Sequence, residues 1–109
     1  MKNNKITGTT IKIKNLEIAQ HDFPDQMKWK EAKKACTELG EGWRLPTKDE
    51  LNILYKNMKK IGGFDGGEYW SSTEGEMYGA WGQYFDDGLQ VNFEDNVKGT
   101  HSVRAVRSI

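Results

Sequence analysis

The chain contains little of the chemistry that marks disulfide-linked, metal-bound or membrane proteins. Its 109 residues include one cysteine, Cys36, so an internal disulfide or a site of several thiolates is excluded. No apolar run comes near the roughly 18 residues of a membrane-spanning helix, and no apolar stretch follows Met1 as a signal peptide requires. We therefore expect no membrane insertion. The compartment stays unknown: the cytoplasm is the default, and the cell surface or secretion stays open if the N-terminus has been trimmed.

The chain also lacks an excess of charge of either sign. It has 16 Lys or Arg against 16 Asp or Glu, and this balance gives no reason to expect nucleic-acid binding. The charge is uneven, however: residues 1–60 carry a net charge of +5 and residues 61–109 one of −5. We expect the two halves to attract each other within one domain spanning 1–109, and an acidic partner docking on the first half is the alternative.

Three segments of the first half have a clear periodicity. Residues 5–19 alternate between β-branched and polar side chains, which predicts one or two half-buried strands. Apolar residues recur at helical spacing over 28–39. A second helix is predicted to begin after Thr47, because Thr47 and Glu50 fit a capping box, and to end at Gly62. This order of elements predicts helices between strands.

The second half is rich in glycine and aromatic residues and is predicted to be β structure. Trp81–Phe93 fits a hairpin around the three-residue loop Asp86-Asp87-Gly88, with Gly88 in the left-handed conformation. This register pairs Trp81 with Phe93 and gathers the large apolar side chains on one face, whereas a two-residue loop would scatter them. The face consists of Trp81, Phe85, Leu89, Val91 and Phe93. A last strand is predicted over 102–107.

Five motifs, in order along the chain, resemble a known family. They are Trp29-x-x-Ala32-x-x-x-Cys36-x-x-Leu39, Gly42-Trp43-Arg44-Leu45-Pro46-Thr47-x-x-Glu50-Leu51, Tyr69-Trp70-Ser71-Ser72-Thr73-Glu74, Ala80-Trp81-x-x-x-Phe85-x-x-Gly88 and Val103-Arg104-x-Val106-Arg107. Over about residues 26–108 they are similar to the bacterial domain of unknown function at the C-terminus of the Lcl collagen-like adhesin, and to the Fibrobacter major paralogous domain. The resemblance implies an α+β, C-type-lectin-like fold: two helices packed on small twisted antiparallel sheets, with the N- and C-terminal strands paired.

The same motifs bear on catalysis. The segment from Arg44 to Glu50 also resembles the formylglycine-generating enzyme superfamily, which shares that fold. That enzyme needs a pair of active cysteines in its C-terminal part, whereas Cys36 stands alone at an apolar position of the first predicted helix. No serine-hydrolase or Cys/His signature and no phosphate-binding loop is present. We therefore expect no enzyme, no catalytic residue and no cofactor, with the formylglycine-type enzyme as the less favoured alternative.

Acidic side chains make the second half rich in oxygen, as calcium sites are. They are Asp65, Glu68, Glu74, Glu76, Asp86, Asp87, Glu94 and Asp95. Their spacing fits no calcium loop, and His21 and His101 lack the partners of a zinc site. The calcium triplets of sugar-binding C-type lectins, Glu-Pro-Asn, Gln-Pro-Asp and Trp-Asn-Asp, are missing too. We expect no metal site.

Aromatic side chains are the remaining candidates for ligand contacts. The four tryptophans lie on apolar stripes or inside family motifs, so we expect each of them in the core. Tyr69, Tyr78 and Tyr84 are the better candidates, because they lie in loops or on the face opposite Trp81. Three arginines are expected to make internal bonds instead: they are Arg44, Arg104 and Arg107.

The sequence therefore predicts a non-catalytic binding or interaction module. Its loops around 64–79 and the outer face of its hairpin would be presented to a glycan or a protein ligand. The predicted contact residues are Glu74, Tyr78, Tyr84, Gln90 and Asn92. A structural or oligomerisation subunit is the alternative, and the sequence leaves the oligomeric state open.

Overall fold

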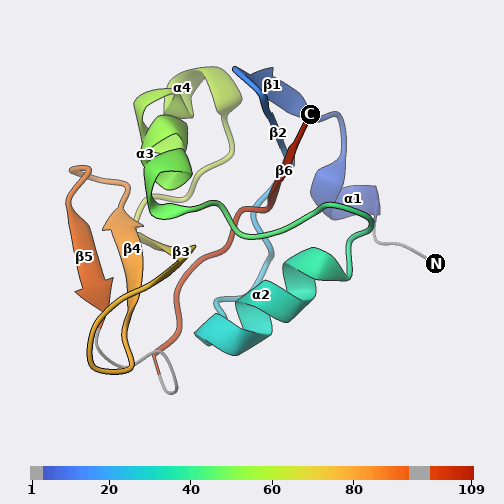
Figure 1. Cartoon of the computed structure of the whole chain (residues 1–109). Helices are drawn as coiled ribbons and strands as arrows, with labels where there is room; N and C mark the ends of the chain where they lie inside the picture. The colour runs from blue at the N-terminus through green and yellow to red at the C-terminus, as the bar shows by residue number, and fades with distance from the viewer. Residues whose placement is uncertain (1–3, 94–98) are drawn as a thin grey trace.

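The computed structural model describes residues 4–93 and 99–109, and it has an α+β architecture (Figure 1). A short helix, α1 (Asn4–Thr7), precedes a hairpin of β1 (Ile11–Ile13) and β2 (Leu16–Ile18). The helices α2 (Trp29–Thr37), α3 (Lys48–Lys56) and α4 (Met58–Ile61) follow. The chain then forms β3 (Glu68–Glu74), β4 (Ala80–Tyr84), β5 (Gln90–Phe93) and β6 (Val106–Ser108).

Local sequence explains where α3 begins and where it is interrupted. The Thr47 hydroxyl accepts a hydrogen bond from the Glu50 N–H at 3.2 Å, and the Glu50 carboxylate accepts one from the Thr47 N–H at 2.9 Å, which is the predicted capping box. The helix predicted to continue to Gly62 breaks at Asn57, whose side-chain amide donates to the Ile53 carbonyl at 2.8 Å. The Asn57 backbone leaves the helical conformation, with φ −111° and ψ 19°, so α4 is a separate turn.

The N-terminal segment also differs from the prediction. Residues 4–7 form α1 rather than the start of a strand. Ile6 is buried in the core there, and the backbone N–H groups of Gln20 and His21 donate to the carbonyls of Thr7 and Ile6 at 2.8 and 3.1 Å. Gly8, with φ 53°, then turns the chain toward β1. Tertiary packing of Ile6 therefore overrides the strand preference of this segment.

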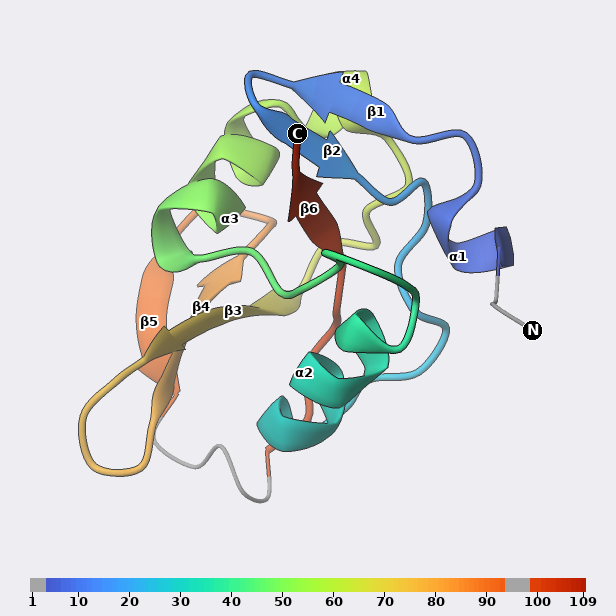
Figure 2. The same ribbon diagram turned by 45° about the vertical axis from the view of Figure 1, so that its right-hand side comes forward.

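Two three-stranded antiparallel sheets form the fold, in the orders β1-β2-β6 and β3-β4-β5. As predicted, strands from the two ends of the chain pair, with Ile18 opposite Val106. The C-terminal segment runs through the middle of the molecule (Figure 2). Along this segment His101 forms an isolated β-bridge with Met27, and Ser102 forms one with Tyr69. The predicted strand 102–107 is thus one isolated bridge, at Ser102, followed by β6, which begins only at Val106.

The β4–β5 hairpin differs from the predicted register by one residue. Trp81 lies opposite Asn92 instead of Phe93, and the Tyr84 N–H donates to the Leu89 carbonyl at 2.9 Å, so the loop has four residues, 85–88. Gly88 has the expected left-handed conformation, with φ 87°. Because side chains alternate along a strand, a shift of one residue in the register changes which residues of β4 and β5 share a face of the hairpin. One face has Trp81, Gln83, Gln90 and Asn92, and the other has Tyr84, Leu89, Val91 and Phe93.

Two apolar clusters fill the interior. One lies around α2 and consists of Ile6, Ala19, Trp29, Ala32, Cys36, Leu39, Trp43, Leu45, Trp70, Ala80, Val103 and Ala105. The other lies around α3 and consists of Ile13, Leu16, Ile18, Leu51, Leu54, Ile61, Tyr69, Phe85 and Val106. The sheet β3-β4-β5 contributes to both clusters, Trp70 to the first and Tyr69 to the second. No helix in the described part of the chain is long and apolar enough to cross a membrane.

Candidate functional site

The turn between β3 and β4, residues 75–79, exposes two large apolar side chains. Met77 is 79% exposed and Tyr78 is 87% exposed. Both also have a left-handed backbone, with φ 56° and 62°. The Gly79 N–H donates to the Glu76 carbonyl at 2.9 Å, so Met77 and Tyr78 are the central residues of a hydrogen-bonded turn of the type I′ class. That class favours Asn and Gly, and neither residue gains burial there.

The side chain of Asn92, on β5, packs against the backbone of this turn. Its Nδ2 donates to the Glu76 carbonyl at 3.2 Å. Its amide also lies so close to Gly75 and Gly79 that neither position has room for a Cβ. The buried Oδ1 of Asn92 finds no hydrogen-bond partner among the described residues. Asn92, predicted as a contact residue, is therefore placed where it shapes the turn.

Trp81 and Lys48 form the surface next to the turn. Trp81 is half-buried, whereas Trp29, Trp43 and Trp70 are buried, so the core prediction is confirmed for these three and wrong for Trp81. The Lys48 Nζ lies 3.6 Å from the centroid of a Trp81 ring, a cation–π contact. Trp81 belongs to neither apolar cluster, and the Lys48 side chain covers part of its ring instead.

Gln90 on β5 and Gln83 on β4 join the same face of the sheet to α3. Gln90 Nε2 donates to the Lys48 carbonyl at 2.8 Å, and Gln83 Nε2 donates to Asn52 Oδ1 at 2.9 Å. Gln83 is fully buried, and its second donation, to the Gly88 carbonyl at 3.0 Å, fixes the hairpin loop. The amide of Gln90 is thus engaged within the fold.

The other predicted contact residues lie apart from this group. Tyr84 is half-buried on the opposite face, where its ring meets Phe93 edge-on at 5.8 Å, so it does not share a face with Gln90 and Asn92 as predicted. Glu74 is exposed at the end of β3, beside the turn. The structure brings Glu74, Tyr78 and Asn92 together around the turn and leaves Tyr84 outside it.

Tyr69 is in the core, so its selection as a binding candidate is wrong. Its hydroxyl donates to Asp22 Oδ2 and accepts from the Asp65 N–H, and no part of the residue is exposed. Burial, followed by the neighbouring Asp22 carboxylate, raises the pKa of the Tyr69 hydroxyl well above its ordinary value. Tyr69 remains a neutral donor inside the fold.

The three arginines make the internal bonds predicted for them. Arg44 pairs with Glu50 at 2.6 Å, Arg104 with Asp22 at 2.7 Å and Arg107 with Glu17 at 2.7 Å. Each pair joins segments that are apart in sequence or caps a helix, and the Arg104 guanidinium is fully buried. These arginines therefore act as structural residues.

Cys36 is fully buried on α2. Burial raises the pKa of its thiol to about 12, so the thiolate needed for nucleophilic or redox chemistry is not formed near neutral pH. No group of three or more His, Cys, Asp or Glu side chains in the described ranges could hold a metal ion. Glu94 and Asp95, which belong to the acidic set of the sequence, lie outside the described residues.

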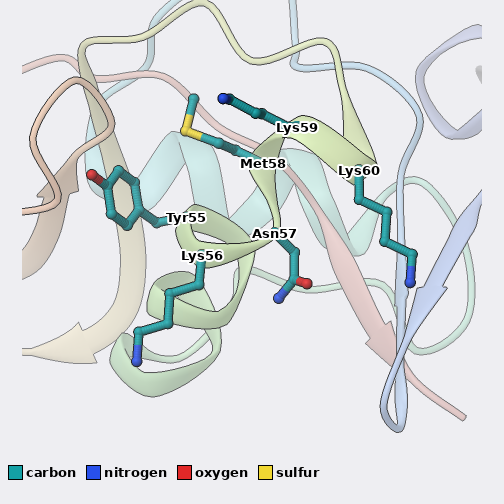
Figure 3. A pocket seen from close by; sticks show the side chains of 6 residues that line it. All are labelled: Tyr55, Lys56, Asn57, Met58, Lys59 and Lys60. Atoms are coloured by element: carbon teal, nitrogen blue, oxygen red, sulfur yellow. The ribbon is translucent and has the colours of Figure 1, made fainter.

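A hollow of about 440 Å³ lies at the junction of α3 and α4 and shares no lining residue with the turn at 75–79. It is lined by Tyr55, Lys56, Asn57, Met58, Lys59 and Lys60. Figure 3 shows that the Lys56 and Lys60 side chains extend in different directions. The three ammonium groups therefore do not converge on one point, and the turn at 75–79 is the better candidate site.

Met77 was missed by the sequence reasoning. A methionine among polar residues gives no periodic signal, and methionine more often fills a core. The pattern Gly75-x-x-x-Gly79 was the available indication. Two glycines so close together in the sequence suggest a tight turn whose central side chains point outward.

Comparison with known proteins places the chain in a structural class. The solved structure titled "Crystal structure of botrocetin" superposes with a TM-score of 0.68 at 12% sequence identity, over 94% of this chain and 98% of that chain. This similarity shows a C-type-lectin-like fold, as the sequence motifs implied. No curated protein matches the chain. The sequence profile described as the Lcl C-terminal domain matches residues 4–107, and the chain therefore belongs to the Lcl C-terminal domain family.

Proposed function

We propose that the chain is a non-catalytic binding module that presents the β3–β4 turn to a macromolecular ligand. The observation that supports this is the combination found at Met77 and Tyr78: both side chains are exposed, and both backbones are left-handed. A non-glycine residue in that conformation costs about 1 kcal/mol or more. Because both side chains are exposed, burial within the chain does not offset this cost. We infer that contact with a ligand is the reason why methionine and tyrosine occupy these positions.

The chemistry of the turn favours a protein ligand over a glycan. Methionine and tyrosine are enriched at protein–protein interfaces, where they supply flexible and rigid apolar contact area respectively. Tyr78 adds a hydroxyl, and Glu74 and Glu76 give the rim a negative charge. A glycan ligand, the other class predicted from the sequence, would use Tyr78 and the half-buried Trp81 as stacking surfaces.

A double variant tests the role of the turn without breaking it. Met77→Asn with Tyr78→Gly installs the sequence that type I′ turns prefer, so the turn is kept while both apolar side chains are lost. Ile109→Ala is the matched control, because Ile109 is also exposed (59%) but directly follows β6, in the other sheet.

Two measurements separate the ligand classes. A glycan panel is screened by thermal shift, where a ligand at about one hundred times its Kd adds roughly 2.7 kcal/mol and raises Tm by several degrees. For a protein ligand, a photo-crosslinking amino acid is placed at position 78 or, as the control, at position 109, in cells that naturally contain the protein. The partner so found is purified and its Kd is measured. We expect an adduct from position 78 only, and binding that the double variant loses and Ile109→Ala keeps; equal binding by the double variant would contradict the proposal.

A further inference from the structure

The strand β5 forms an edge of its sheet. The order β3-β4-β5 gives it one neighbour, β4. In Figures 1 and 2 it lies at the outer end of the sheet, and no described strand is drawn beyond it. An edge strand offers unpaired N–H and C=O groups to another chain, so its protection decides whether it pairs.

The hydrogen-bond pattern shows which backbone groups are turned outward. The Tyr84 N–H donates to the Leu89 carbonyl, so this carbonyl faces β4, while the Leu89 N–H donates to Asp87 Oδ1 in the loop. In an antiparallel ladder every second residue directs its backbone N–H and C=O groups to the same neighbour. The backbone groups of Val91 and Phe93 therefore also face β4. The N–H and C=O groups of Gln90 and Asn92 therefore point away from the sheet.

The edge has few of the features that normally block pairing. The segment Leu89–Phe93 has no charged residue and no proline, although charges and prolines are common guards of edge strands. Leu89 is 57% exposed and Val91 is half-buried, so apolar side chains accompany the outward backbone groups. The short strand limits the area that a partner can cover, which predicts a weak complex rather than a permanent one.

We propose that β5 pairs with β5 of a second copy of this chain, antiparallel and with the two-fold axis at Val91. In this register Gln90 lies opposite Asn92 of the second copy, and both have outward backbone groups, so the two residues exchange a pair of backbone hydrogen bonds. The symmetry repeats that pair on the other side of Val91. Any other antiparallel register keeps fewer of these bonds within the four-residue strand.

The side chains match this register as well. Leu89 lies opposite Phe93 of the second copy on the face that also has Val91, so apolar side chains meet apolar ones. On the other face Gln90 lies opposite Asn92 of the second copy, and both side chains are uncharged and keep their amide donations to Lys48 and Glu76 within their own chain. No like charges oppose one another between residues 89 and 93. The joined sheet has six strands and presents the two 75–79 turns at opposite ends.

Val91 is the position at which the pairing is tested. It opposes itself across the axis as a non-hydrogen-bonded pair, with Cα atoms about 4.5 Å apart, so equal charges there repel strongly. Val91→Lys and Val91→Glu each place like charges on the axis, whereas mixing the two variants places opposite charges there. Val91→Thr keeps the β-branched shape and is the matched control.

Sedimentation equilibrium at about 10 μM to about 1 mM measures the association. We expect the unaltered chain and Val91→Thr to form dimers as concentration rises, the Lys and Glu variants to remain monomers, and their equimolar mixture to recover dimers. A monomer throughout the range for the unaltered chain, or dimers that the Lys and Glu variants retain, would overturn the proposal.

Backbone amide exchange gives a second readout that needs no variant. The outward N–H groups of Gln90 and Asn92 should exchange at least tenfold more slowly at the highest protein concentration than at the lowest. The Val91 N–H, already bonded to β4, should change little. Exchange at Gln90 and Asn92 that is independent of concentration would refute the register even if the chain dimerises through another surface.

Discussion

Arg104 donates from Nε to Oδ1 of Asp22 at 2.7 Å, and this ion pair joins two segments that are 82 positions apart in the sequence. The pair is almost completely buried, with side-chain exposures of 0% and 7%. Arg104 also donates to the carbonyls of Ala19 and Gly62, each at 3.2 Å. One guanidinium therefore connects the loop after β2, the end of α4 and the C-terminal segment at the centre of the fold.

Loss of Arg104 is expected to be among the most destabilising single changes outside the apolar core. Arg104→Met leaves the Asp22 carboxylate buried without its cation, and breaking such a pair costs about 3–5 kcal/mol. The variant Arg104→Met with Asp22→Asn should lose less than the sum of the two single variants, because it removes both charges. Urea unfolding measures all three. Additive losses, or a loss below about 1 kcal/mol for Arg104→Met, would contradict the assignment.

The tryptophans are predicted to differ in stability, although their motifs look alike. Trp70 is fully buried and its Nε1 donates to the Met27 carbonyl at 2.7 Å, so Trp70→Ala should cost about 3–5 kcal/mol. Trp81 is half-buried and outside both apolar clusters, so Trp81→Ala should cost about 1–2 kcal/mol. Chemical denaturation of the two variants, side by side, provides the comparison. Equal losses would mean that Trp81 belongs to the core.

The elements that depend on local sequence were predictable. The capping box at Thr47 and Glu50 needs only a four-residue pattern, and the structure contains both of its hydrogen bonds. The fold class was implied by the resemblance of the five motifs to a known family, and the similarity to botrocetin confirms it. The positive φ of Gly88 was predictable in the same way, since a tight loop there requires a residue without a Cβ.

The hairpin register was not predictable from apolar alternation. That reasoning assumes one covered face, whereas α3 lies on one face of β4–β5 and Trp70 with His101 meets Phe93 on the other. Gln83 can be buried because Asn52, on α3, and the Gly88 carbonyl accept its two donors. Partners that come from another element are not visible in the pattern of a single strand. The same limit applies to Gln90 and Asn92, whose amides are used inside the fold.

The charge on Glu50 makes stability depend on pH. Burial alone acts to raise its pKa, but the Arg44 guanidinium and the Thr47 N–H outweigh burial and hold the pKa of Glu50 below its ordinary value. A carboxyl group whose pKa is lower in the folded state stabilises the fold above its unfolded-state pKa. That stabilisation is lost as the pH falls through the folded-state pKa.

Glu50→Gln isolates this contribution, because glutamine still fits a capping box. We expect the variant to be less stable at pH 7 by about 1 kcal/mol. The difference from the unaltered chain should begin to shrink near the unfolded-state pKa of about 4.3 and vanish as the pH falls through the lower folded-state pKa, because Glu50 is then protonated and uncharged. Unfolding free energies across this pH range provide the measurement, with exposed Glu41→Gln as the control. A difference that stays constant with pH would show that the amide, and not the lost charge, causes the effect.

Met77 and Tyr78 in the turn at 75–79 are predicted to lower the free energy of unfolding relative to residues that prefer a left-handed backbone. Met77→Asn with Tyr78→Gly relieves two left-handed non-glycine conformations, and the expected gain is about 1–2 kcal/mol. For a chain of this size such a gain raises Tm by roughly 5–10 °C. Met77→Ala with Tyr78→Ala removes the same apolar surface but keeps a Cβ at both positions, so it should gain little. Equal stability of the two double variants would show that the left-handed backbone at positions 77 and 78 costs little free energy. Ligand contact would then not be needed to explain Met77 and Tyr78.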